Sequence, residues 1–198
     1  MHFAPDTEAS LAFTVDLANT VAGATKSGID ELVTPAQLAA LFVAHRFSGR
    51  LDQTEAELAE VRETRQLLRR IWTMDRDDAA LDVNTMLLSA LARPRLMRHD
   101  GLDWHLHATD PDAPLAERIR VEVGLALVDV IRTDETGRLR ACAAEDCDGL
   151  LADLSRNGSK RFCSIRCGNR MNMIAFRQRA AGATVSAAGA GTTGAGRG

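Results

Sequence analysis

Four cysteines carry the clearest chemistry in this 198-residue chain, and all of them fall within one short segment: Cys142, Cys147, Cys163 and Cys167. Their spacing is C-x4-C-x15-C-x3-C, and the first residues of the chain show no export signal. Paired cysteines in such a chain are more often metal ligands than disulfides. Four thiolates suit one tetrahedral, structural Zn²⁺. Four reduced cysteines that merely pack together, and an iron–sulfur cluster, are the alternatives.

The elements around the cysteines must bring the two pairs together. Residues 150–154 predict a strand, Asn157-Gly158 a tight turn, and residues 159–162 a second strand. A helix follows Cys163, so Cys163 and Cys167 would lie one helical turn apart. This order of cysteine knuckle, hairpin and helix predicts a treble-clef-like zinc finger over residues 138–180.

Charge is divided unevenly along the chain. The whole chain has a net charge of −3, but residues 1–137 carry −9 and residues 138–198 carry +6, with no acidic residue after Asp153. Three arginines of the predicted helix, Arg166, Arg170 and Arg177, fall within about 40° of one another around its axis. Such a surface favours DNA contact, and a solvated basic face is the alternative. The predicted DNA-contacting residues are Arg156, Lys160, Arg161, Arg166, Asn169, Arg170 and Arg177.

Residues 1–137 predict a mostly helical body with short strands, which makes the fold class α+β. Helices are expected at about 35–47, 54–73, 78–92 and 114–133, the first two behind the capping boxes that begin at Thr34 and Thr54. Residues 11–20 alternate like a strand, and Asp100-Gly101 predicts a hairpin turn. The Ala/Gly-rich segment 181–198 is expected to be disordered.

Five residues of the body are candidates for lining a ligand pocket: Asn19, Thr20, Trp104, His105 and His107. Asn19 and Thr20 could instead cap a turn. The two histidines share one face of a strand, where either a second metal site or an ordinary polar face fits. Trp72 and Trp104 are expected in the core.

Two classes of protein are disfavoured. No nucleophile–base signature or glycine-rich phosphate loop is present, so we expect no enzyme. No apolar run is long enough to span a bilayer, so we expect no membrane partner and a cytoplasmic location.

Residues 142–179 resemble the CGNR zinc finger, whose namesake tetrad is Cys167-Gly168-Asn169-Arg170. The body resembles the ABATE domain, with Asn19-Thr20 and the stretch Trp104–His107 as the matching pieces. The resemblance implies a stress-induced transcription regulator whose finger binds DNA and whose body senses a small-molecule ligand.

We therefore hypothesise a DNA-binding transcriptional regulator that acts as a homodimer or with a partner, because a lone finger should bind DNA weakly. A protein- or RNA-interaction module and a thiol-based redox sensor are the alternatives.

Overall fold

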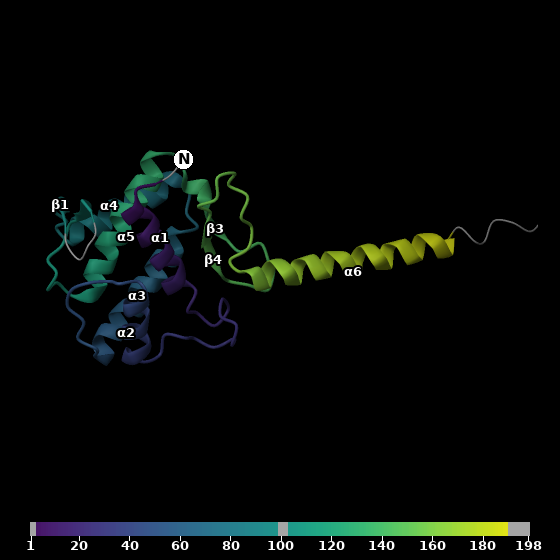
Figure 1. Ribbon diagram of the computed structural model, residues 1–198, viewed down its shortest axis with the longest axis horizontal. Helices are drawn as coiled ribbons and strands as arrows, with labels where there is room; N and C mark the ends of the chain where they lie inside the picture. Colours follow the sequence, from purple (N-terminus) through teal and green to yellow (C-terminus); the bar gives the residue numbers. More distant parts are fainter. Residues whose placement is uncertain (1–2, 99–102, 190–198) are drawn as a thin grey trace, which may run out of the picture.

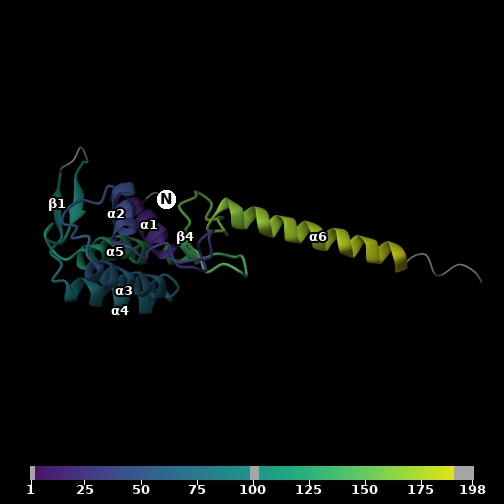
Figure 2. The ribbon, with the colours of Figure 1, turned by 90° about the horizontal axis from the view of Figure 1, so that it is seen from below.

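The computed structural model describes residues 3–98 and 103–189, and the side chains up to residue 179. Its helices are α1 (Pro5–Ala18), α2 (Pro35–Ala44), α3 (Glu55–Ile71), α4 (Arg76–Ser89), α5 (Leu115–Arg132), the 3-10 turn η1 (Thr136–Arg138) and α6 (Ile165–Gly189). Its strands are β1 (Arg95–Met97), β2 (His105–His107), β3 (Leu139–Ala141) and β4 (Leu150–Ala152). Figures 1 and 2 show α1 to α5 gathered into one body and α6 projecting away from it. The predicted α+β class with a mostly helical body is confirmed.

The predicted helix starts agree with the structure. Thr34 and Gln37 form a complete capping box at α2. Thr54 accepts a hydrogen bond from the Glu57 N–H at α3. The cap of α4 is Asp75, which lies just before the predicted aspartates. These caps satisfy backbone N–H groups that the first helical turn leaves without partners.

The prediction of a strand at residues 11–20 is wrong, because residues 11–18 belong to α1 and Asn19 caps its end. Pro5 occupies the first turn, and acidic Asp6 and Glu8 follow it, which favours a helix start. The buried residues Thr7, Leu11, Thr14 and Ala18 recur at helical spacing. Two of these four buried residues are threonines, so a search for apolar residues at helical spacing did not detect this helix.

The core lies where α5 packs against α1, α3 and α4 (Figure 1). Its fully buried side chains include Leu17, Leu38, Leu68, Ile119 and Leu127. Trp72 is buried as predicted, with 2% of its surface exposed. Trp104 is 63% exposed, so its placement in the core was wrong.

Two small antiparallel hairpins complete the fold. β1 pairs with β2 as predicted, and the expected turn at Asp100-Gly101 lies outside the described residues. β4 is the predicted strand of the cysteine segment, but its partner is β3, which precedes the first cysteine. The predicted pairing of β4 with residues 159–162 is wrong.

A buried carboxylate explains that difference. Asp153 is fully buried and accepts hydrogen bonds from the Ser155 hydroxyl at 2.5 Å and from the Lys160 N–H at 2.7 Å. Burial opposes its ionisation, but these bonds and the nearby Arg140 charge keep the pKa of Asp153 below its ordinary value. The chain after β4 therefore wraps around Asp153 instead of returning as a strand. Gly158, with φ of 58°, provides the predicted turn.

Helix α6 runs through residues 181–189, which we had expected to be disordered. Residues 190–198 of that segment lie outside the described residues. The alanines of this segment favour a helical backbone, because alanine has the highest helix propensity. Within the described chain, the helices are too short or too polar to cross a membrane.

Candidate zinc centre and nucleic-acid interface

The four cysteine sulfurs form a compact cluster. Cys147 Sγ lies 3.6 Å from Cys163 Sγ and 3.7 Å from Cys167 Sγ, and the last two sulfurs are 3.8 Å apart. All four sulfurs lie within 4.8 Å of one another. Tetrahedral Zn²⁺ with Zn–S bonds of about 2.3 Å requires sulfurs about 3.8 Å apart. The cluster therefore fits one zinc ion with four protein ligands, which leaves the ion no open position. An iron–sulfur cluster would hold its cysteines farther apart, because several metal atoms lie between them.

The β3–β4 connection forms the first half of this site. Cys142 follows β3 directly, and its N–H donates to the Gly149 carbonyl at 2.7 Å. Backbone N–H groups also point at the sulfurs: Gly149 donates to Cys147 Sγ at 3.4 Å and Cys163 to Cys142 Sγ at 3.5 Å. A Cβ atom at position 149 would lie 2.6 Å from Cys163 Sγ, so only glycine fits there.

Thiol ionisation also requires a cation. Burial raises the pKa of the Cys147 and Cys163 thiols. Burial acts in the same direction on Cys167, but hydrogen bonds from Ser164 and the neighbouring cysteines lower its pKa below the ordinary value. Several thiolates this close repel one another unless a divalent ion offsets their charge. The donor set thus fits zinc. The ion would hold together the knuckle (residues 142–149), the loop between β4 and α6 (residues 153–164) and the first turn of α6.

The cysteine segment is docked on the body through β4. Asn19 Nδ2 donates to the Leu150 carbonyl at 2.9 Å, and the Leu150 N–H donates to Asn19 Oδ1 at 2.7 Å. Trp72 Nε1 donates to the Leu151 carbonyl at 3.1 Å. Leu150 and Ala152 belong to the apolar core of the body. The second hairpin is therefore shared by the body and the finger.

A second set of contacts joins the body to the knuckle. Arg69 of α3 donates to the carbonyls of Ala18 and Asp148, both at 2.7 Å. The Asp148 N–H donates to the Gly23 carbonyl at 3.0 Å. A Cβ at position 23 would lie only 2.0 Å from Asp148 Oδ2, so a larger residue there would displace the Asp148 side chain.

Sequence reasoning missed Arg65, which pairs within the body, and Arg69, which holds the knuckle, although a signal was present. Arg65 and Arg69 occupy the same face of α3 as Leu58 and Trp72. Arg65 is 2% exposed and pairs with Asp30 through two bonds of 2.7 and 2.8 Å. Arginines inside an apolar helical stripe indicate buried partners elsewhere in the chain.

The predicted DNA-contacting residues fall into two groups. Arg170 pairs with Asp146 of the knuckle at 2.6 Å and reaches Cys167 Sγ at 3.7 Å. Arg166 is exposed but donates to the Thr25 carbonyl of the body at 3.3 Å. The remaining predicted residues are exposed: Arg156, Lys160, Arg161, Asn169 and Arg177. Arg161 also lies over the Phe162 ring, 5.6 Å from its centre.

The candidate pocket residues fall into two groups, Asn19 with Thr20 after α1, and Trp104, His105 and His107 at β2. Asn19 binds β4, and Thr20 accepts a hydrogen bond from Arg65 at 2.7 Å. Trp104 lies on the surface, and the two histidines lie on β2.

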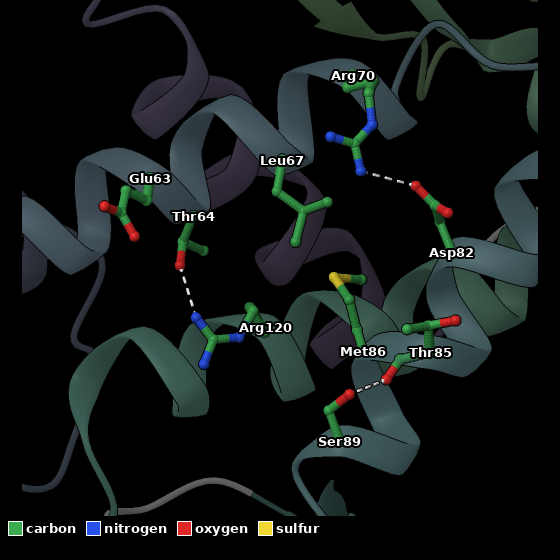
Figure 3. Close-up of a pocket in the computed structure, with 9 residues that line it drawn as sticks. All are labelled: Glu63, Thr64, Leu67, Arg70, Asp82, Thr85, Met86, Ser89 and Arg120. Atoms are coloured by element: carbon green, nitrogen blue, oxygen red, sulfur yellow. Dashed lines mark hydrogen bonds and ion pairs between the residues drawn. The ribbon is translucent and has the colours of Figure 1, made fainter.

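A pocket of about 410 Å³ instead lies between α3, α4 and α5 (Figure 3). It is lined by Glu63, Thr64, Leu67, Arg70, Asp82, Thr85, Met86, Ser89 and Arg120. Arg120 donates to the Thr64 hydroxyl at 3.0 Å, and Arg70 pairs with Asp82 at 3.0 Å. The five candidate residues are not among those that line it.

Two family models match the chain. The ABATE model, described as "Putative stress-induced transcription regulator", matches residues 11–146. The CGNR zinc-finger model matches residues 138–180. The two matches overlap across β3 and the first cysteine, which is where the structure joins the body to the finger. Among curated proteins, none matches the chain.

Proposed function

Because the chain belongs to the ABATE family and carries a CGNR zinc finger, we propose that it regulates transcription by binding DNA. The zinc-held loop after Asp153 and the projecting helix α6 form the contact surface. The observation that carries the proposal is the positive charge of this segment. Eight basic residues and no acidic one follow Asp153, and the exposed ones are Arg156, Lys160, Arg161, Arg166, Arg177 and Arg179.

The exposed group of residues supplies the contacts. Arg156, Lys160 and Arg161 lie on the loop that Asp153 organises, and Arg177 lies on the part of α6 that projects from the body (Figure 1). Their charges fit DNA phosphates, and Asn169 can hydrogen-bond a base edge. Arg170 acts as a positioning residue, because its partner Asp146 ties the helix to the knuckle.

The body keeps the contact restricted to this surface. Residues 1–137 have a net charge of −9, which repels phosphates from the rest of the molecule. A single finger with few phosphate contacts binds weakly, so a homodimer or a partner would strengthen the interaction.

The test is DNA binding by the full zinc-loaded chain, followed by fluorescence anisotropy over a series of salt concentrations. Arg156→Ala/Arg161→Ala should weaken binding and reduce the salt slope by about two phosphate contacts. Arg98→Ala/Arg132→Ala is the matched control, because it removes two exposed arginines from the acidic body. Equal effects of the two double variants would contradict the assigned surface.

Absence of DNA binding at low salt would contradict the proposal itself. Salt-sensitive retention of RNA, or of a protein partner, would then favour an interaction module. Loss of DNA binding on mild peroxide treatment, together with zinc release, would favour the hypothesis of a thiol-based redox sensor.

Helix α3 suggests how a ligand in the body could act on the finger. Thr64, Leu67 and Arg70 of this helix line the 410 Å³ pocket (Figure 3), whereas Arg69 and the adjoining Trp72 hold β4 and the knuckle. We expect Thr85→Trp, which adds a large side chain to the pocket wall, to change DNA affinity. Leu81→Trp is the control, because this exposed residue of the same helix does not line the pocket. Identical affinities would argue against coupling through α3.

A further inference from the structure

His105 and His107 bring two imidazole rings together on the surface of the body. They are alternate residues of β2, so both side chains leave the same face of the strand. Their Nε2 atoms are 2.9 Å apart, and their ring centres are 4.8 Å apart.

The other nitrogen of each ring fixes the position of its proton. His105 Nδ1 lies 2.7 Å from the Asp103 carbonyl oxygen, which can only accept. His107 Nδ1 lies 3.0 Å from Glu122 Oε1, which as a carboxylate also accepts. Both Nδ1 atoms therefore carry hydrogens. In the neutral rings, both Nε2 atoms present lone pairs to each other.

Two lone pairs at 2.9 Å repel each other, and a proton or a metal ion shared by the two Nε2 atoms would relieve that repulsion. A proton would make one ring an imidazolium, and a metal ion would bind both Nε2 atoms. Metal-bound histidines commonly donate Nδ1–H to a carboxylate or a backbone carbonyl, which is the arrangement found here. With metal–nitrogen bonds of about 2.0–2.1 Å, two ligands at right angles lie about 2.9 Å apart, whereas tetrahedral ligands lie about 3.3 Å apart.

We propose that His105 and His107 form a second metal site, separate from the cysteine cluster, that takes a divalent ion with right-angle coordination such as Ni²⁺ or Cu²⁺. Square-planar and tetragonal geometry with imidazole ligands is typical of these two ions. Water would complete the coordination.

The surroundings favour a cation. The Glu122 carboxylate, 3.0 Å from His107 Nδ1, places a negative charge beside the pair. The side chains of His107 and Glu122 are 22% and 19% exposed, which leaves the ion a path from solvent.

The experiment is titration of the full zinc-loaded chain with Ni²⁺, followed by calorimetry and native mass spectrometry. The wild type should take up one Ni²⁺ while it retains its zinc. His105→Gln and His107→Gln should each weaken Ni²⁺ binding at least tenfold, and Glu122→Gln should weaken it about tenfold by releasing His107. His45→Gln is the matched control, because His45 pairs with Asp16 on α1 at 2.9 Å.

A measurement on the unaltered protein keeps the proposal testable if a variant fails to fold. Paramagnetic Ni²⁺ should broaden the NMR signals of the His105 and His107 rings before those of His45. Absence of Ni²⁺ uptake, or uptake with unchanged affinity by His105→Gln and by His107→Gln, would overturn the site and leave a shared proton between the rings. Neither result depends on DNA binding.

Discussion

The body and the finger are stabilised by different means. The body buries a continuous apolar core between α1, α3, α4 and α5. The cysteine cluster buries few apolar groups of its own, with Ala144 beside Cys142 and Cys167, and Phe162 and Met171 partly buried against them. A metal and hydrogen bonds to a neighbouring surface replace the core that so short a segment cannot build.

The two regions also use charge differently. In the body, Arg65 and Asp30 form a nearly enclosed pair that fixes the loop before α2. In the finger, Arg170 and Asp146 form a more exposed pair beside a metal ligand, and most of the other basic side chains remain exposed. Charges of the first region are paired inside the fold, whereas the second region pairs only some of its charges and exposes the rest.

Removal of zinc tests this contrast most severely. A chelator at neutral pH should unfold the knuckle and the start of α6, since zinc binding to finger peptides is worth about 10–16 kcal/mol. NMR amide signals of α5 should persist while those of residues 142–170 change. Renewed zinc should restore the spectrum. Simultaneous loss of both sets would show that the body and the finger unfold as one unit.

The Asp30–Arg65 pair should give the next largest effect. Asp30→Asn leaves Arg65, 3% exposed, without its carboxylate and should lower the free energy of unfolding by about 3 kcal/mol. The matched control is Asp82→Asn, whose partner Arg70 is 60% exposed and which should cost less than about 1 kcal/mol. Urea denaturation measures both, and equal losses would contradict the distinction.

The same pair has a pH signature. The hydrogen bonds from Arg65 hold the pKa of Asp30 below its ordinary value. Its stabilisation is therefore complete above the unfolded-state pKa, about 3.9, and is lost as the pH falls through the lower folded-state value. Asp30→Asn should flatten this acid limb of the stability curve.

The junction between the regions should be less costly to weaken. Asn19→Ala removes both hydrogen bonds to the Leu150 backbone and should cost about 2 kcal/mol. Asn84→Ala, at an exposed position of α4, is the matched control and should leave stability unchanged or slightly raised, because alanine has the higher helix propensity. Thermal denaturation distinguishes them, and a neutral Asn19 variant would show that β4 is held by its apolar side chains alone.

The smallest predicted change in free energy distinguishes the paired Arg170 from the exposed Arg177. Arg170→Ala should weaken zinc retention about tenfold, because the side chain supports Cys167 from outside the coordination sphere. Arg177→Ala should leave zinc retention unchanged and affect DNA affinity instead. Competition with a chromophoric chelator measures the first quantity. Equal zinc affinities in the two variants would place Arg170 with the exposed residues.

Local signals predicted much of this molecule. Cysteine spacing located the metal centre, and the capping residues Thr34 and Thr54 located two helices to within a residue at their starts. Both depend on neighbours in sequence. The pairing of β4 with β3 depends on Asp153. The periodicity of the neighbouring residues does not reveal that Asp153 is buried or that it contacts the following loop. Docking by Asn19 likewise joins residues 131 positions apart.

The strand shared by the two regions constrains how such proteins can be recombined. A chain divided at Gly137 would take Leu150 and Ala152 out of the body and expose the apolar surface that they cover. Exchange of fingers between relatives at that boundary would yield an aggregation-prone body. A workable exchange would keep β3, the knuckle and β4 with their own body and replace only the chain beyond Asp153. The segment that has to stay with the body thus extends to β4, past the boundary at residue 138 where the cysteine-containing finger was expected to begin.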